Sequence, residues 1–312
     1  MADVATGGTL DQYRVEELLS RSGMASIFKA TDTESGRAVV LKIPHIQFES
    51  DVVFFERFRR EEEIGLSIDH PNVIRILQPR EKSRPYIVME YFPGKPLIAS
   101  LREKGRLAVE EALEIARQVC EALICLHEQG VVHRDIKPEN ILVDARGRVK
   151  IIDFGIALLK SARRLTWTGL SPASGTPDYA APERIRGKRG DARTDVYAVG
   201  ILLYELVTGN LPWDEPCTAA LFHAKANQEP RPPCYHVPGF DHALENVILK
   251  AIEREPRDRH ASAAELLADL RNPQAAVRRR YSSRESRIRI SIVLAAIFCG
   301  SAALVWLSSP HG

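Results

Sequence analysis

The apolar positions in the first part of the chain follow a strand-like pattern. Short β-branched or aromatic runs separated by turn residues predict three strands, at 39–43, 74–77 and 86–89. Between the first two lies a longer stretch that predicts a helix, because Asp51 can cap its start and a proline follows its end near Ile68. The pattern therefore indicates a small β-rich unit that contains one helix.

The apolar spacing becomes helical beyond the turn at Phe92-Pro93-Gly94. Residues 108–129 repeat apolar side chains every three or four positions, which predicts a long helix that Gly130 ends. Residues 196–207 are apolar nearly all round, as is typical of a buried helix, and 263–270 predicts a last short one. We expect an α+β fold with a β-rich part at 13–92 and a helical part at 93–271.

A run without charges, residues 290–307, follows the last predicted helix. As a helix it would span about 27 Å, close to the hydrocarbon thickness of a bilayer. Arg287 and Arg289 precede it, which by the positive-inside rule places the body of the chain in the cytoplasm. The run therefore predicts a single-pass protein of the cell (inner or plasma) membrane. A buried core helix is the alternative, and small residues such as Gly300 leave a homodimer through this segment open.

The remaining segments are assigned by composition. We expect a flexible N-terminus at 1–12, a basic juxtamembrane linker at 272–289 and a short tail at 308–312. Residues 271–289 hold seven Arg and one Glu, a balance of +6, so the other residues up to 270 carry 2 − 6 = −4. A mildly acidic body argues against nucleic-acid binding, which needs a basic face on the fold. The five cysteines have no zinc-ligand spacing and indicate free thiols.

The residues that carry chemistry gather around one predicted hairpin. An Asp, a Lys and an Asn fall within His133-Arg134-Asp135-Ile136-Lys137-Pro138-Glu139-Asn140. Two strand-like runs follow, 141–143 and 149–152, joined by a turn. Asn140 begins the first run and Asp153 ends the second, so the hairpin should bring them together. Their amide and carboxylate oxygens are ligands of the kind that Mg²⁺ takes beside phosphate oxygens.

These motifs resemble those of the eukaryotic-type serine/threonine protein kinase family, over about residues 13–270, and the chain looks like its bacterial membrane-anchored members. Lys42 resembles the strand lysine that pairs with ATP phosphates, and Glu61 falls where the family has its partner glutamate. Asp195 resembles the aspartate that orders the catalytic loop. Glu183, in Ala181-Pro182-Glu183, resembles the glutamate that pairs with an arginine, here Arg259. The resemblance implies a two-lobed kinase fold.

The resemblance also implies roles. Asp135 would be the catalytic base, Lys137 would neutralise charge on the transferred phosphoryl group, and Asn140 and Asp153 would hold the metal. The expected cofactors are ATP and Mg²⁺, with Mn²⁺ as an alternative. Lys137 two residues after Asp135 is the serine/threonine form of the loop, so the expected partners are proteins phosphorylated on Ser or Thr.

The segment between Gly155 and Pro182 would be the activation segment of such a kinase. Thr166 and Thr168 are its candidate phosphorylation sites, and Arg134 beside the catalytic Asp could pair with a phosphate there. The alternative is that both threonines are ordinary solvated loop residues.

The loop that covers the phosphates departs from the family pattern. Ser20, Ser22 and Ala25 replace its three glycines, and only Gly23 remains. This departure leaves open a membrane-tethered pseudokinase or scaffold, whereas the complete catalytic set favours an active kinase; a small-molecule phosphotransferase is disfavoured. The expected nucleotide-binding residues are Leu19, Ser20, Gly23, Ile27, Val40, Lys42, Glu61, Met89, Glu90 and Phe92.

Overall fold

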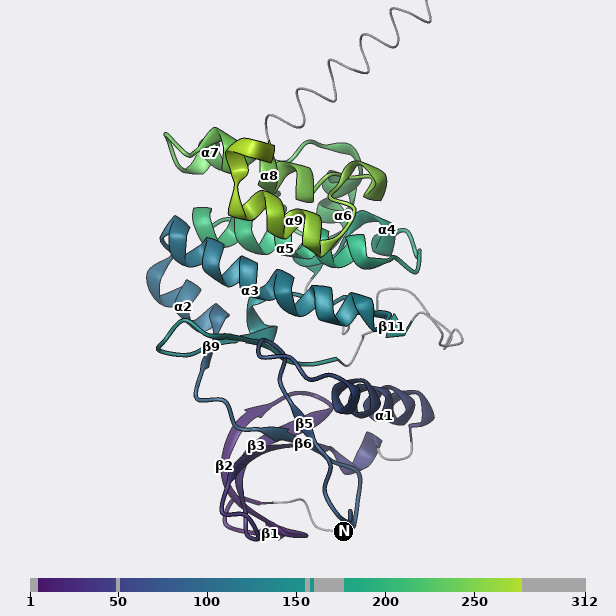
Figure 1. Ribbon diagram of the computed structural model, residues 1–312. Helices are drawn as coiled ribbons and strands as arrows, with labels where there is room; N and C mark the ends of the chain where they lie inside the picture. Colours follow the sequence, from purple (N-terminus) through teal and green to yellow (C-terminus); the bar gives the residue numbers. More distant parts are fainter. Residues whose placement is uncertain (1–4, 49–50, 155–157, 160–176, 277–312) are drawn as a thin grey trace, which may run out of the picture.

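The computed structural model describes residues 5–48, 51–154, 158–159 and 177–276. These residues form two lobes, a β-rich one that holds the N-terminus and a helical one above it in Figure 1. The predicted two-lobed α+β architecture is therefore confirmed. The candidate catalytic residues come from segments of both lobes, so the fold matters here for how it brings those segments together.

The small lobe is built on one antiparallel sheet in the order β1-β2-β3-β4-β6-β5. The strands are β1 (Thr9–Leu10), β2 (Tyr13–Arg21), β3 (Ala25–Asp32), β4 (Ala38–Pro44), β5 (Ile76–Leu77) and β6 (Ile87–Glu90). Side chains alternate between the two faces of a strand, so one face of β3 and β4 supplies Phe28, Leu41 and Ile43 to a buried cluster. Tyr86 lies in the same cluster, fully buried.

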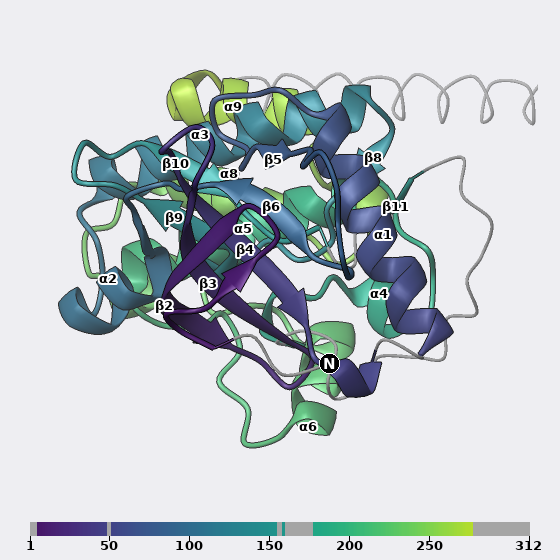
Figure 2. The same cartoon turned by 90° about the horizontal axis from the view of Figure 1, so that it is seen from below.

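Helix α1 (Val52–Ser67) lies beside this sheet and packs against β5 (Figures 1 and 2). The predicted cap is present, since the N–H of Phe54 donates to Asp51 Oδ1 at 3.0 Å. Gly65 faces β5 so closely that a Cβ there would lie 2.1 Å from Ile76 Cδ1. This close approach fixes how far α1 stands from the sheet, and with it the position of Glu61.

The large lobe is organised around helix α5, nearly all of whose residues are buried, as its apolar pattern predicted. Helices α3 and α8 pack against it, and α9 packs against all three. Among the described residues the helices of this lobe are α2 (Leu97–Lys104), α3 (Val109–Glu128), α4 (Pro182–Ile185), α5 (Ala192–Thr208), α6 (Thr218–Asn227), α7 (Pro233–His236), α8 (His242–Ala251) and α9 (Ala263–Arg271).

Two small sheets lie where the lobes meet. In one, β9 (Ile141–Val143) pairs with β10 (Val149–Ile151) and with β7 (Lys95–Pro96). In the other, β8 (Val131–Val132) pairs with β11 (Leu158–Leu159). The pairing of Ile141 with Ile151 confirms the hairpin predicted between Asn140 and Asp153.

The structure differs from the predictions in detail. The N-terminus expected to be flexible over 1–12 contributes strand β1, because Thr9–Leu10 pairs with β2 and Leu10 is buried. The strand expected at 74–77 is shorter, and the strand expected at 39–43 extends by one residue at each end, from Ala38 to Pro44. In the part of the chain that the structure describes, no helix has the length and apolar character to cross a bilayer. The span predicted at 290–307 lies outside that part.

Candidate active site

Three elements from both lobes meet at the ammonium group of Lys42. Lys42 Nζ, on β4, donates to Glu61 Oε1 at 2.6 Å and Oε2 at 2.8 Å, from α1. It also donates to Asp153 Oδ1 at 3.2 Å, just after β10. Burial alone would lower the pKa of Lys42, but the carboxylates of Glu61 and Asp153 outweigh it and raise that pKa above its ordinary value. Lys42 is therefore a fixed cation at physiological pH.

The candidate catalytic loop, 133–140, is held by one buried carboxylate on α5. Asp195 Oδ2 accepts from the backbone N–H of His133 at 2.9 Å, and Oδ1 accepts from that of Arg134 at 2.7 Å. Arg134 has a positive φ of 71°, which turns the loop at this point. His127 Nε2, on α3, is 2.8 Å from Asp195 Oδ2. Burial acts to raise the pKa of Asp195, yet the hydrogen bonds and charge from His127 and its other neighbours lower it overall. Asp195 therefore stays ionised.

Within this loop, two side chains orient the carboxylate of Asp135. Asn140 Nδ2 donates to Asp135 Oδ2 at 2.7 Å and to its backbone carbonyl at 2.9 Å. Lys137 Nζ lies 3.0 Å from the same Oδ2. Both contacts use one oxygen, and among the described residues Oδ1 has no hydrogen-bond partner. The contacts of Oδ2 thus fix the carboxylate and leave Oδ1 as the oxygen that could accept a hydroxyl proton.

The predicted metal ligands lie at neighbouring points of the backbone. The N–H of Ile152 donates to the carbonyl of Asn140 at 2.9 Å, which brings Asn140 close to Asp153. Asp153 has a positive φ of 69°, whereas the next side chain, Phe154, is buried with its ring 5.4 Å from that of His133. Among the described residues, no group of three or more His, Cys, Asp or Glu could hold a metal. One amide and one carboxylate suit Mg²⁺, which takes its remaining ligands from phosphates and water.

Sheet register places half of the ten predicted nucleotide-binding residues on one face. Ile27 pairs with both Ser20 and Lys42, and Val40 pairs with Met89. Cross-strand partners share a face, and so do alternate residues of one strand, so all five side chains lie on the side of Lys42. The fold therefore places these five residues on one side of the sheet, which we call the nucleotide face.

The other predicted nucleotide-binding residues lie elsewhere. Leu19 is the extra residue of a β-bulge, between the pairs made by Leu18 and Ser20, and is exposed. Glu90, the last residue of β6, directs its carboxylate to Lys150 Nζ at 2.6 Å and to the N–H of Arg75 at 2.9 Å. Phe92 is buried, with Lys150 over its ring. At Glu90, only the backbone remains to face a nucleotide.

The turn that carries Gly23 is closed by the hydroxyl of Ser22. Ser22 Oγ accepts from the N–H of Ala25 at 3.0 Å and from that of Met24 at 3.3 Å, and it donates to the carbonyl of Ala25. A glycine at this position would leave both N–H groups without this partner. Serine is therefore more than a small replacement for glycine, because its hydroxyl takes up two backbone donors of this turn.

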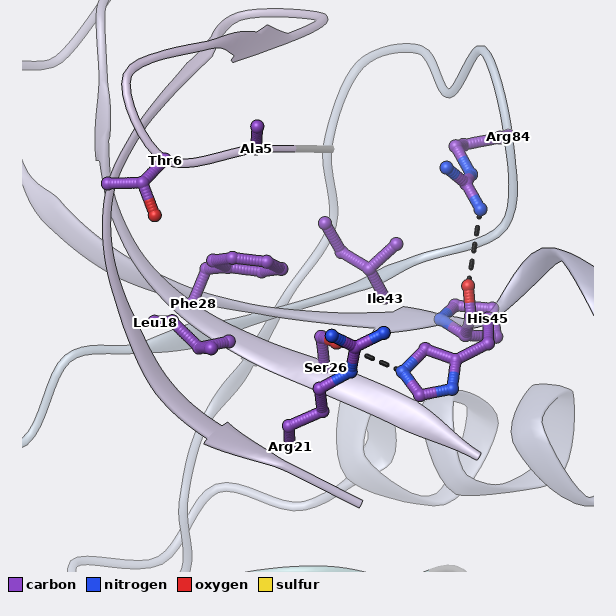
Figure 3. A pocket seen from close by; sticks show the side chains of 10 residues that line it. Ala5, Thr6, Leu18, Arg21, Ser26, Phe28, Ile43, His45 and Arg84 are labelled. Carbon is purple, nitrogen blue, oxygen red and sulfur yellow. Dashed lines mark hydrogen bonds between the residues drawn. The ribbon is translucent and has the colours of Figure 1, made fainter. Parts of the chain in front are cut away.

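A hollow of about 210 Å³ lies on the opposite face of the sheet (Figure 3). Phe28 and Ile43 line it, each adjacent in sequence to a residue of the nucleotide face, and Ser26 Oγ is 3.0 Å from His45 Nε2 at its edge. Because alternate residues of a strand face opposite sides, the sheet separates this hollow from Lys42.

Two residues that contact or support the candidate catalytic loop were not predicted from the sequence. Arg184 Nη1 donates to the carbonyl of Arg134, and His127 contacts Asp195 as described above. The first follows directly on Ala181-Pro182-Glu183, and the second lies at helical spacing from the buried residues Cys120 and Leu123 of α3; these were the available signals. Glu183 itself pairs with Arg259, as expected, at 2.7 Å in a buried site. The phosphorylation candidates Thr166 and Thr168 lie outside the described residues.

Comparison with known proteins identifies the family. Residues 13–270 match the model described as the protein kinase domain, so the chain belongs to the protein kinase family, whose members use ATP and a divalent metal. It is 38% identical over 269 residues to a probable serine/threonine-protein kinase of Corynebacterium efficiens, and 36% over 267 residues to the serine/threonine-protein kinase PknB of Mycobacterium tuberculosis. These matches cover 83% of this chain but only 41% and 42% of the relatives.

The contacts of Ser22 predict an effect on nucleotide affinity. Ser22→Ala frees the N–H groups of Met24 and Ala25 while keeping a Cβ, so the affinity for ATP should rise about two- to tenfold, the range of one net hydrogen bond. Titration calorimetry of the full chain with ATP and Mg²⁺ measures it. Ser35→Ala is the matched control, because the hydroxyl of Ser35 also accepts from a backbone N–H but lies in the exposed turn between β3 and β4, and it should leave the affinity unchanged. Weaker binding by Ser22→Ala would show that the hydroxyl assists the phosphates.

Proposed function

We propose that the chain is an ATP-dependent serine/threonine protein kinase. The observation that carries the proposal is the joint placement of Asp135, Lys137 and Asn140 in one hydrogen-bonded loop, with the Lys42–Glu61 ion pair formed beside Asp153. Phosphoryl transfer needs positioning and charge neutralisation more than covalent help, and this set supplies both.

In the proposed reaction, the oxygen of a substrate Ser or Thr hydroxyl attacks the γ-phosphorus of ATP, and the bond to the β–γ bridging oxygen breaks to release ADP. Oδ1 of Asp135 accepts the hydroxyl proton, while Asn140 and Lys137 hold Oδ2. Lys137 also balances charge on the transferred group, and Lys42 orients the other phosphates. Asn140 and Asp153 would hold Mg²⁺, which supplies further charge neutralisation when bound.

Activation by phosphorylation of Thr166 or Thr168 is part of the proposal. Four guanidinium groups support it: burial and the nearby charge of Arg184 lower the pKa of Arg134 to about 10, with Arg189 and Arg57 acting in the same direction. A phosphate near Arg134 would relieve this repulsion between like charges.

One observation supports the alternative function, a pseudokinase. Ser22 occupies two backbone donors of the phosphate loop, and this would weaken ATP binding if the turn did not open. A chain of this kind would keep the fold as a membrane-tethered scaffold without transferring phosphate.

Replacing the catalytic carboxylate separates the two functions. The full chain, given Mg²⁺ and γ-labelled ATP, should label itself and a generic basic protein. Asp135→Asn should reduce the rate about 10²- to 10⁴-fold, the usual contribution of a positioned general base. Asp214→Asn, which changes an exposed carboxylate of the large lobe in the same way, is the matched control and should retain activity. Peptide mapping of the labelled chain should place phosphate on Thr166 or Thr168; no labelling by the unmodified chain would favour the scaffold.

The proposed location is the cell membrane, with the kinase lobes in the cytoplasm and 290–307 as the anchor. The charge-free sequence of this run and the arginines before it support the proposal. Deleting 290–307 should move the protein from the membrane pellet to the soluble fraction after alkaline carbonate extraction, whereas deleting 308–312 should not. If both deletions leave the protein in the pellet, the anchor lies elsewhere. A homodimer through this segment is also a proposal, which crosslinking in membranes would test.

A further inference from the structure

A buried lysine of helix α6 holds the backbone of a distant segment. Lys225 is 1% exposed, and its Nζ donates to the carbonyls of Pro177 and Ala180, each at 3.0 Å, and to that of Asp178. Its three N–H bonds therefore meet three carbonyls of one short segment, 177–180, in which only that of Tyr179 is left out. The ammonium also lies over the rings of Tyr197 and Trp213, at 5.4 and 5.9 Å from their centroids.

This arrangement is costly for a lysine, which is almost never fully buried without a charged partner. Burial lowers the pKa of Lys225, and the carboxylate of Asp178 opposes the shift. No ion pair of Lys225 is found among the described residues. The three carbonyls and the two ring faces stabilise the charge of Lys225. The same hydrogen bonds hold the three carbonyls close to one another.

The segment that Lys225 holds lies beside the catalytic loop. Tyr179, within it, is buried and donates its hydroxyl to Glu205 of α5. The chain then continues through buried Ala181 to Arg184, which donates to the carbonyl of Arg134, the neighbour of Asp135. Pro177, Asp178 and Ala180 are each partly exposed. The segment 177–180 is therefore partly exposed. The chain that follows it is attached, through Arg184, to the residue before Asp135.

We propose that Lys225 is a positioning residue for the protein substrate: it fixes the backbone of 177–180, against which the chain carrying the reactive hydroxyl must lie to reach Asp135. The inference rests on the proposed kinase function and adds the element that shapes the substrate side of the site. Lys225 itself touches neither ATP nor the reacting atoms. Its loss should therefore affect the protein substrate and spare the nucleotide.

The first test separates the two substrates. Lys225→Met, in the full chain, keeps the length of the side chain and removes its donors. With a generic basic protein as substrate, its KM should rise about tenfold, which corresponds to roughly 1.4 kcal/mol. The KM for ATP should stay within about twofold. Lys225→Gln, which retains two donors, should show a smaller rise, and His223→Ala, exposed on the same helix, should show none. An unchanged KM for the protein substrate, or an equal rise for both substrates, would overturn the proposal.

The second test does not require catalysis. Amide hydrogen exchange of residues 178–184 should become faster in Lys225→Met than in the unmodified chain, while that of α5 changes little. Equal protection of residues 178–184 against exchange in both proteins would overturn the proposal that Lys225 holds this segment. If the unmodified chain transfers no phosphate, the proposed function fails, and this exchange measurement still decides whether Lys225 holds the segment.

Discussion

The arrangement of the two lobes depends on the ion pairs that the ammonium group of Lys42 makes. This group contacts one carboxylate from α1 and another from the segment after β10, at 2.6 and 3.2 Å. A buried charge is stable only with partners. The two ion pairs therefore fix the positions of β4, α1 and the end of the β9–β10 hairpin relative to one another. The close contact of Gly65 with Ile76 sets the position of α1, and the register of β4 with its neighbours then places the nucleotide face beside the same cation.

The large lobe uses the same physical device twice. Asp195, fully buried on the apolar helix α5, accepts two consecutive backbone N–H groups of the catalytic loop. Lys225, buried on α6, donates to three backbone carbonyls of the segment opposite. In both cases one charge with no solvent to compete for it fixes an irregular backbone segment. Asp135 belongs to the first of these segments, and Arg184, which follows the second, donates to the carbonyl of Arg134 beside it. These contacts explain how a site built from loops can have a defined geometry.

Local spacing predicted much of this. The hairpin between Asn140 and Asp153 and the cap at Asp51 follow from short-range patterns, and the structure has both. The partners of Lys225 lie 45 to 48 residues before it, so no periodicity could reveal them. From sequence alone, Ser22 is only a replacement for a glycine. The hydrogen bonds of its hydroxyl depend on the path of the turn, which residue type does not reveal. Thr166, Thr168 and 290–307 stay predictions, since they lie outside the described residues.

The most direct test of the account is a double-mutant cycle at Lys42 and Glu61, measured as the rate of phosphoryl transfer by the full chain. If Glu61 acts only by orienting Lys42, Glu61→Gln should slow an unmodified chain but add little to Lys42→Met, which has already lost the cation. The account therefore predicts strongly non-additive effects, with the double variant about as slow as Lys42→Met alone. Two independent, additive losses would contradict it.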